Sequence, residues 1–292
     1  MKIILGAAQF GLDYGISNMH GKTTIQEAKK ILQYAYSNDI EMIDTAIQYG
    51  NSENVIGHSI DKGDNWKIVT KTINFSGDCI NQGHIKQLKD SLNKSLLNLG
   101  ESNLYGLLIH SCDNIFLPGG ERLFKTMEAM KDEGFINKIG VSVYSSEQIN
   151  RVLDNYAIDL IQLPISILDQ RLINDGSLAR LKEHNVEIHA RSVFLQGLIL
   201  MQPNNVHPWF SAISGELNDF HMEAARRNMT ALQLALGFVQ SIKEIDRIVV
   251  GVSTLEQLYE IIDAKLVRVD INNLSNLAIN NPKFLNPSNW KI

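Results

Sequence analysis

Short apolar runs alternate with longer amphipathic segments from one end of the chain to the other. Several of the short runs are almost unbroken in Val, Ile and Leu, as expected of parallel strands that are buried on both faces. We therefore expect eight strands, at residues 3–10, 41–46, 67–72, 104–110, 138–143, 160–165, 187–194 and 247–253.

The segments between these runs carry the three- and four-residue spacing of amphipathic helices. Helices are expected at residues 24–37, 84–100, 119–134 and 253–266. In the first of them, one face carries the apolar residues Ile25, Ala28, Ile31, Leu32 and Ala35. Gly100 closes the second, as expected of a glycine C-cap.

Strict alternation of eight strands with helices predicts an α/β fold, a single (β/α)8 TIM barrel that covers residues 1–292 as one domain. An open, doubly wound sheet is the alternative, but no GxGxxG phosphate turn follows the first strand. One connection, residues 195–229, is long and rich in turn residues, yet it contains Trp209 and Phe210. Loops of this length are usually lids or binding loops, so this segment is expected to help form a site.

Charge and cysteine content narrow the functional class. The 292 residues carry a formal net charge of −5, with acidic and basic residues mixed along the chain. That balance gives no sign of a nucleic-acid or membrane surface, and no apolar run approaches the roughly 18 residues of a membrane span. Two cysteines, Cys79 and Cys112, are too few for a disulfide framework. With no signal-like apolar core at the start, a cytoplasmic protein is expected.

Polar residues stand at the ends of successive predicted strands, where barrels of this type hold their active sites. Asp44 ends the second strand with Tyr49 in the loop beyond it, Lys71 ends the third, and His110 ends the fourth. Taken singly, each residue has a structural explanation, such as a turn acceptor, loop packing or a solvated charge. Converging on one mouth, an acid, a phenol, an amine and an imidazole form a proton-transfer set.

This set suits the reduction of a carbonyl group. A phenol has a pKa of about 10 and works as an acid or base near neutral pH only if a cation stabilises its anion. Lys71 can supply that cation, Asp44 can keep the lysine charged, and His110 can hold the substrate oxygen near the phenol of Tyr49. Two other interpretations stay open: a lyase or aldolase with Lys71 as Schiff-base nucleophile, and a nucleotide-binding barrel without catalysis.

At these residues the sequence resembles the aldo-keto reductase superfamily, over almost the whole chain. The string MIDTAIQYGNSENVIG (42–57) fits the family pattern IDTA..YG.SE..IG, with Ser52 as the expected N-cap of the next helix. Further family motifs recur in order: TK at 70–71, IH at 109–110, GVS at 140–142, Gln162, LQGLIL at 195–200, TALQLALGFV at 230–239 and VVGVSTLEQL at 249–258.

The resemblance implies a barrel that binds NAD(P)H extended across its mouth, with NADPH as the expected cofactor and NADH as the alternative. It implies a catalytic set of Asp44, Tyr49, Lys71 and His110, with Tyr49 as general acid. The implied cofactor contacts are Ser142 and Gln162 at the nicotinamide carboxamide, Arg191 against the nicotinamide ring, Ser192, Leu195, Gln196 and Gly197 along the pyrophosphate, and Gly251, Ser253, Thr254 and Gln257 around the adenosine phosphate.

The sequence departs from the family in its cofactor segments. Arg191 stands where many members place an aromatic ring, Gln257 where several NADPH-specific members place arginine, and Ile261 where asparagine is frequent. A neutral glutamine holds a 2′-phosphate less well than the charged fork of arginine. Modest discrimination between NADPH and NADH is therefore expected, unless Arg247 or Lys265 substitutes.

The expected partner is a small-molecule carbonyl substrate, and a sugar or sugar derivative is one class that fits. The opening LGAAQFGLDYGI resembles a bacterial subgroup associated with surface-polysaccharide or carbohydrate metabolism. The chain ends at Ile292 without the long C-terminal loop that shapes the pocket of some members, and no metal site is expected. The residues expected to line the substrate pocket are Tyr14, His207, Trp209 and Phe210.

Overall fold

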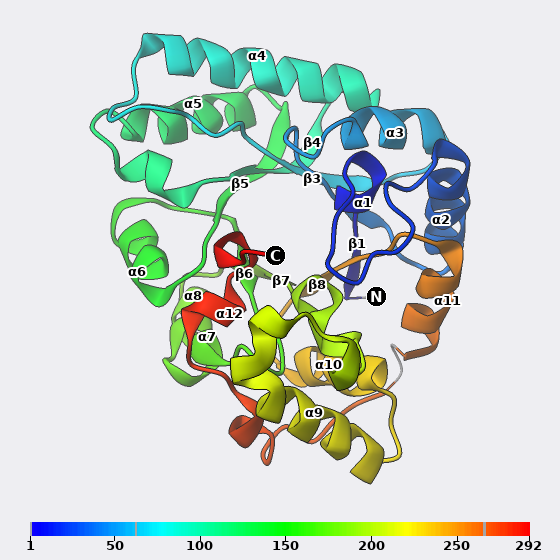
Figure 1. Ribbon diagram of the computed structural model, residues 1–292. Coiled ribbons are helices and arrows are strands. Elements are labelled where there is room, and N and C mark those ends of the chain that lie inside the picture. The colour runs from blue at the N-terminus through cyan, green and yellow to red at the C-terminus, as the bar shows by residue number, and fades with distance from the viewer. Residues whose placement is uncertain (1, 62, 265–266) are drawn as a thin grey trace.

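The computed structural model describes residues 2–61, 63–264 and 267–292. Within them, eight parallel strands close into a barrel in chain order, and the last strand pairs with the first (Figure 1). The strands are β1 Ile3–Gly6, β2 Met42–Asp44, β3 Lys67–Lys71, β4 Leu104–Ile109, β5 Ile136–Ser142, β6 Leu160–Pro164, β7 Glu187–Arg191 and β8 Arg247–Gly251. The (β/α)8 TIM barrel predicted from the alternation is confirmed.

Helices form a ring around the outside of the barrel (Figure 1). They are α1 Ala8–Gly11, α2 Ile25–Ser37, α3 Ser52–Ser59, α4 Gln82–Leu99, α5 Glu121–Asp132, α6 Ser146–Asn155, α7 Arg171–Asn174, α8 Ser177–Glu183, α9 Ser214–Arg226, α10 Ala231–Ser241, α11 Leu255–Ala264 and α12 Pro282–Leu285. Short 3₁₀ helices lie at η1 Cys112–Phe116, η2 Leu195–Leu200, η3 Pro203–Asn205, η4 Pro208–Ile213, η5 Ser275–Leu277 and η6 Pro287–Asn289.

Capping residues set several of these boundaries. The Thr24 side chain accepts a hydrogen bond from the Glu27 amide at the start of α2, and Asn81 and His84 form a capping box on α4. Gly100 ends α4 in the left-handed region, with φ of 70°, so the predicted glycine C-cap is confirmed. The start of α2 and both ends of α4 therefore follow local signals that are already present in the sequence.

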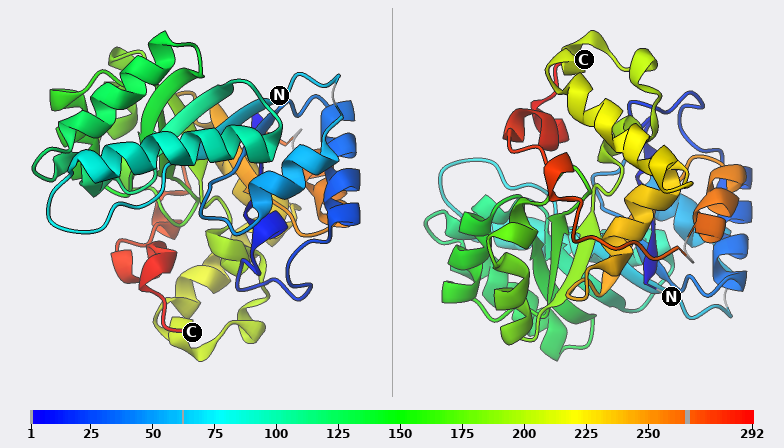
Figure 2. Two further views of the ribbon diagram at one scale, coloured as in Figure 1. Left: turned by 90° about the horizontal axis from the view of Figure 1, so that it is seen from above. Right: turned by 90° about the horizontal axis from the view of Figure 1, so that it is seen from below.

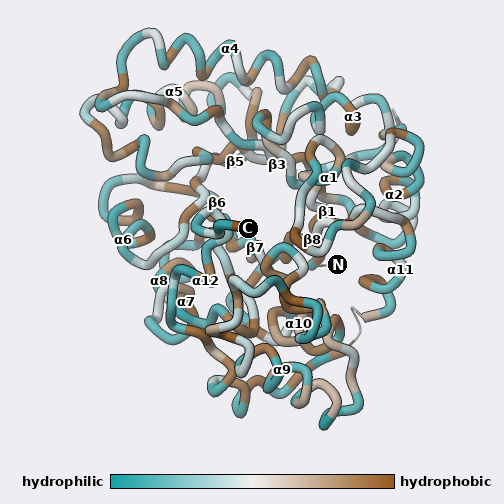
Figure 3. The backbone as a smooth tube through the Cα atoms, viewed as in Figure 1, coloured by the Kyte–Doolittle hydropathy of each residue, from teal (hydrophilic) through white to brown (hydrophobic). Residues whose placement is uncertain are grey.

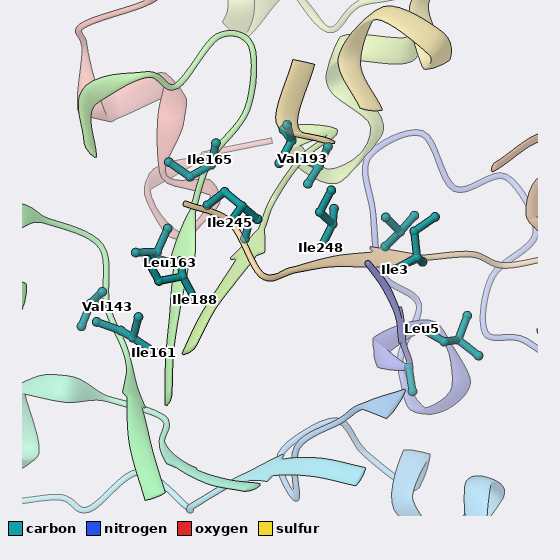
Figure 4. Packing of buried hydrophobic residues seen from close by; sticks show 14 of the residues in the cluster. Ile3, Leu5, Val143, Ile161, Leu163, Ile165, Ile188, Val193, Ile245 and Ile248 are labelled. Atoms are coloured by element: carbon teal, nitrogen blue, oxygen red, sulfur yellow. The ribbon is translucent and has the colours of Figure 1, made fainter. Parts of the chain in front are cut away.

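Two apolar layers hold the barrel together. The larger layer lies between the strands and the helix ring, and it includes Ile3, Leu5, Ile161 and Ile188 (Figure 4). The ring helices alternate hydrophilic and hydrophobic residues along their length, as amphipathic helices do (Figure 3). A smaller cluster is formed by residues from different strands that pack together: Ile4, Met42, Val69, Leu108 and Leu160, with Tyr105 and Val249 against them.

The smaller cluster fills the barrel interior, since its members alternate along each strand with residues of the outer layer. Side chains two positions apart point to the same face of a strand. Two residues beyond Met42, Val69 and Leu108 stand Asp44, Lys71 and His110. The strand period therefore aims these polar side chains into the barrel mouth, above an apolar plug.

Three local expectations need correction. β1 ends at Gly6 instead of continuing to residue 10, because the chain turns into α1 at Ala8. Asn51, without a side-chain cap, occupies the N-cap position of α3, and Ser52 is the first helical residue. The Ser52 hydroxyl instead donates to the carbonyl oxygen of Ala7, 2.7 Å away, and lies 3.0 Å from the Thr45 hydroxyl. Ile25, placed on the apolar face of α2, is 56% exposed.

The long connection after β7 is largely helical, not an open loop. Residues 195–229 contain η2, η3, η4 and α9. They stand at the same end of the barrel as the C-terminal segment, and the two termini lie at opposite ends of the barrel (Figure 2). Two segments that are distant in sequence thus share the end of the barrel toward which the strands run.

The turn at α1 is packed directly against the loop that carries Tyr49. A Cβ on Gly11 would overlap the carbonyl oxygen of Tyr49 and would lie 2.7 Å from the amide nitrogen of Ser52. Gly50, with φ of 57°, faces the carbonyl of Gly11 from the other side. Only a hydrogen at position 11 lets the two backbones approach this closely.

Replacing Gly11 by alanine should therefore destabilise the protein and displace the Tyr49 loop. Overpacking of this kind costs about 1–3 kcal/mol, which thermal unfolding followed by circular dichroism will measure. Gly215→Ala is the control, because a Cβ there meets no described atom within 4 Å. A Gly11→Ala protein with the same melting temperature as Gly215→Ala would contradict the packing argument.

Candidate active site

A cavity of about 610 Å³ opens at the carboxyl ends of the strands. It is lined by inward-facing strand residues and by the loops that follow β1, β7 and β8. Asp44, Tyr49, Lys71 and His110, which the sequence placed at successive strand ends, all line this one cavity. The structure thus brings the four side chains together.

A buried ion pair forms the floor of the cavity. The Lys71 ammonium donates to both carboxylate oxygens of Asp44, at 2.9 and 2.8 Å, and to the carbonyl oxygen of Thr45 at 2.8 Å. The Gln162 amide nitrogen donates to Asp44 Oδ1 at 2.7 Å. Burial lowers the pKa of Lys71, while the Asp44 carboxylate opposes that shift. All three N–H donors of the ammonium have partners, and the pair is close to neutral overall.

Tyr49 lies partly buried between this ion pair and His110. The Lys71 ammonium is 5.2 Å from the centre of the Tyr49 ring, and the His110 ring meets it edge-on at 6.0 Å between centroids. Burial raises the pKa of the phenol well above its usual range, and the Asp44 carboxylate raises it further. The phenol therefore keeps its proton across the neutral range.

His110 is held as a neutral imidazole. Burial lowers its pKa to about 4, and the nearby Lys71 cation acts in the same direction. Its Nδ1 atom is buried and has no hydrogen-bond partner among the described residues. A buried polar atom without a partner is costly, so the ring is set up to bind a group that enters the cavity.

Arg191 supplies a second cation in the cavity. Its guanidinium lies 4.2 Å from the centre of the Tyr144 ring and donates to the carbonyl oxygen of Val143 and to the Ser192 hydroxyl, at 3.0 and 3.2 Å. Tyr144 was not anticipated from the sequence, although it follows Ser142 at the end of β5. The ring against which Arg191 stacks in this structure is thus a tyrosine of the protein.

Most of the residues predicted to contact a cofactor lie on the cavity wall. The lining includes Ser142, Gln162, Arg191, Ser192, Gln196, Gly197, Gly251, Ser253 and Gln257. Two predicted residues are not part of it. Leu195 is buried in the outer apolar layer, and the Thr254 hydroxyl caps α11 by accepting from the Gln257 amide.

The predicted substrate residues divide in the same way. Tyr14 lines the cavity. His207, Trp209 and Phe210 do not, because they belong to an aromatic cluster beside it. Trp209 packs on Phe210 and Phe284 at 4.8 and 5.1 Å between ring centres, Phe210 packs on Trp290 at 4.9 Å, and His207 caps η4. These aromatic rings bury their apolar surface against one another and against the C-terminal segment.

Some other residues that line the cavity were not predicted from the sequence. Pro287 and Ser288, near the C-terminus, line the cavity. Figures 1 and 2 show the C-terminal segment at this end of the barrel. Gln9, directly after β1, also lines the cavity, and its Oε1 atom is buried without a partner in the described part of the chain.

A family model described as the aldo/keto reductase family matches residues 2–279. The chain belongs to the aldo/keto reductase family. Aldo/keto reductases are NAD(P)H-dependent oxidoreductases that act on small-molecule carbonyl compounds, and this protein is one of them.

Two curated relatives and one solved structure are similar over most of their length. An uncharacterised oxidoreductase of Bacillus subtilis (strain 168), YqkF, is 24% identical over 275 residues, 88% of each chain. An NADH-specific methylglyoxal reductase of Escherichia coli (strain K12) is 26% identical over 255 residues, 76% of this chain and 77% of the relative. The holo form of aldo-keto reductase AKR11C1 from Bacillus halodurans superposes with a TM-score of 0.76 at 20% identity, covering 96% of this chain and 93% of its own.

The cavity fits the nicotinamide dinucleotide that this aldo/keto reductase requires. Two lining residues, His110 and Gln9, carry buried polar atoms without a partner among the described residues, and amide and hydroxyl side chains also line the cavity. In the described ranges, no group of three or more His, Cys, Asp or Glu is arranged to hold a metal ion. No helix of the described part is long and apolar enough to cross a membrane.

Of the two cations considered for a 2′-phosphate, the structure describes one. Arg247 begins β8, at the end of the barrel away from the cavity. Lys265 lies outside the described residues.

Breaking the Lys71–Asp44 pair should cost more stability than removing both of its charges. Lys71→Met leaves a buried carboxylate unpaired, a change that typically costs about 3–5 kcal/mol. The double variant Lys71→Met/Asp44→Asn should regain much of that loss. The measurement is a double-mutant cycle. It compares the urea unfolding midpoints of the wild type, the two single variants and the double variant. Strictly additive effects would show that the two groups do not depend on each other.

The neutral state of His110 should make the protein less stable in mild acid. Its pKa in the folded state, about 4, lies below the roughly 6.5 of an unfolded chain. The unfolded state therefore binds the extra proton, and stability falls as pH drops from about 6.5 toward 4. His110→Gln should remove this part of the loss, so its melting temperature should fall less between pH 7 and pH 5. Equal losses in both proteins would contradict the assignment.

Proposed function

We propose that the protein reduces an aldehyde, ketone or sugar carbonyl to the alcohol, with Tyr49 as the proton donor. The observation that carries this proposal is a phenol that stays protonated, beside a neutral imidazole and a buried ion pair, in the cavity at the carboxyl ends of the strands. When bound, the reduced nicotinamide supplies the hydride. The remaining chemistry, protonation and orientation of the carbonyl oxygen, belongs to the protein.

In this proposal the neutral imidazole of His110 and the phenol of Tyr49 both hydrogen-bond the carbonyl oxygen. Two donors fix the oxygen at the point where negative charge develops during hydride transfer. Tyr49 then gives up its proton to that oxygen. A phenol with a raised pKa is a weak acid at rest, so the alkoxide that forms must be the stronger base.

Lys71 and Asp44 act through Tyr49 in this mechanism. The sequence suggested that the lysine cation lowers the pKa of the phenol. In the structure burial raises the pKa of Tyr49, and the Asp44 carboxylate raises it further. Burial and Asp44 thus keep Tyr49 in its acid form before the reaction. Once the phenolate forms, the ammonium 5.2 Å from its ring is in place to stabilise it.

The alternative of a Schiff-base lyase or aldolase fits less well. Such a mechanism needs a neutral amine with a free path to the substrate carbon. The Lys71 ammonium instead donates its hydrogen bonds to Asp44 and Thr45, and the side chain is 1% exposed. The alternative of a nucleotide-binding barrel without catalysis leaves the complete set of four polar side chains unexplained.

The substrate class is proposed from the cavity and from relatives. Two phenols, Tyr14 and Tyr144, and the apolar side chains of Phe194 and Leu200 line the cavity, which suits a small carbonyl compound or a sugar face. The relative described as a methylglyoxal reductase makes methylglyoxal a natural first substrate to test. Cytoplasmic location, a single domain across residues 1–292 and a role in carbohydrate metabolism are part of the same proposal.

The test is oxidation of NADH and of NADPH with methylglyoxal, a simple ketone and an aldose as substrates. Tyr49→Phe should lower turnover by at least about 10²-fold, as expected for a lost general acid, with cofactor affinity nearly unchanged. Tyr14→Phe is the matched variant, because it removes another phenol that lines the cavity. Wild-type turnover in Tyr49→Phe, with a loss in Tyr14→Phe, would move the proton donor to Tyr14.

A further inference from the structure

The amino end of α11 bears on the choice between the two nicotinamide cofactors. We propose that Glu27 closes this end and selects NADH over NADPH, by occupying the place that a phosphate on the adenosine ribose would take. The inference rests on the proposed function, because it uses the placement of the nicotinamide beside Tyr49.

That placement fixes where the adenosine must lie. Tyr49, Lys71 and His110 form one part of the cavity wall. The end of β8 and the first turns of α11 form another part, through Ser253, Gln257, Glu260 and Ile261. An extended dinucleotide with its hydride-donating ring at Tyr49 therefore brings its adenosine ribose to the amino end of α11.

A helix amino end is normally an anion site, because its first amides lack partners and the helix dipole is positive there. In this protein the amides of Ser253, Leu255 and Gln257 already donate to side chains. The Ser253 amide donates to Gln257 Oε1 at 2.7 Å, and the Gln257 amide donates to Thr254 Oγ1 at 3.3 Å. The Leu255 amide donates to Glu27 Oε1 at 2.8 Å. A phosphate would have to displace these side chains.

Glu27 also places a negative charge at the amino end of α11, where its carboxylate accepts from the Leu255 amide. It sits in the first turn of α2, which packs against α11, and the Thr24 cap fixes that turn. Thr23, just before it, ties the two segments together by donating to the Ser253 carbonyl at 3.1 Å. The carboxylate is therefore held across the amino end of α11 by the fold, and the helix dipole stabilises it there.

The surrounding charges do not cancel this effect. Lys30 lies 3.4 Å from Glu27 Oε2, but its side chain is 63% exposed, so solvent screens the pair. A second carboxylate, Glu260, lines the same end of the cavity. Among the described lining residues, the lysine and arginine side chains are Lys71 and Arg191, both in the catalytic part. A ribose hydroxyl can donate to a carboxylate, whereas a phosphate dianion is repelled by it.

The experiment is a titration of the protein with NADH and with NADPH, without substrate, followed by quenching of tryptophan fluorescence. The wild type should bind NADH at least about tenfold more tightly than NADPH. Glu27→Gln keeps an oxygen acceptor for the Leu255 amide and removes only the charge. It should strengthen NADPH binding by about tenfold and change NADH binding by less than about twofold. Thermal unfolding of the variant checks that the fold is intact.

Glu256→Gln is the matched control, since it removes one negative charge from the exposed side of the same helix turn. It should leave the ratio of the two dissociation constants unchanged. An equal effect of Glu256→Gln and Glu27→Gln, or a wild type that prefers NADPH, would overturn the inference. The same holds if neither nucleotide binds. Binding with the expected preference but no carbonyl reduction would instead overturn the proposed function and leave the role of Glu27 intact.

Discussion

Inside the barrel, Met42, Val69 and Leu108 belong to one apolar plug, and two residues further along the chain stand Asp44, Lys71 and His110. Side chains of a strand return to the same face every second residue, so the two groups are aligned along the barrel axis. A shift of one residue in any strand would turn its polar group toward the helix layer. The register of the closed sheet is therefore the constraint that assembles the cavity, and parallel pairing such as Asp44 with Val69 and Lys71 with Leu108 fixes it.

The electrostatics of the cavity follow from this crowding. A lone buried lysine or carboxylate would be costly there. The strand period brings Lys71 within 2.8 Å of Asp44, so that the two charges pair. The Lys71–Asp44 pair is close to neutral, burial holds His110 neutral, and Tyr49 keeps its proton. The catalytic part of the cavity thus presents polar donors with little net charge. Arg191 contacts Tyr144 and Val143. It is a cation of the cavity that has no carboxylate partner among the described residues.

The two rims of the cavity are built differently. At one rim, the connection after β7 and the C-terminal segment pack on each other through Trp209, Phe210, Phe284 and Trp290. That packing brings Pro287 and Ser288 over the catalytic part. At the other rim, α2 and α11 are joined by hydrogen bonds from Thr23 and to Glu27. One rim is held by aromatic packing and the other by polar contacts, so changes to the substrate end and to the cofactor end can be made independently.

Much of this protein was determined by local features of its sequence. Apolar runs of strand length indicated the eight strands, and caps such as Thr24 and Gly100 set the start of α2 and the end of α4, because these signals act within a few residues. The same alternation put Asp44, Lys71 and His110 at strand ends. Tertiary structure decided the rest. Trp209 and Phe210 do not line the cavity because aromatic residues of the C-terminal segment pack against them, and His207 caps η4. The closure of α11 by Glu27 joins residues 228 positions apart. Contacts of that range arise only when the barrel closes, and no local pattern of residues encodes them.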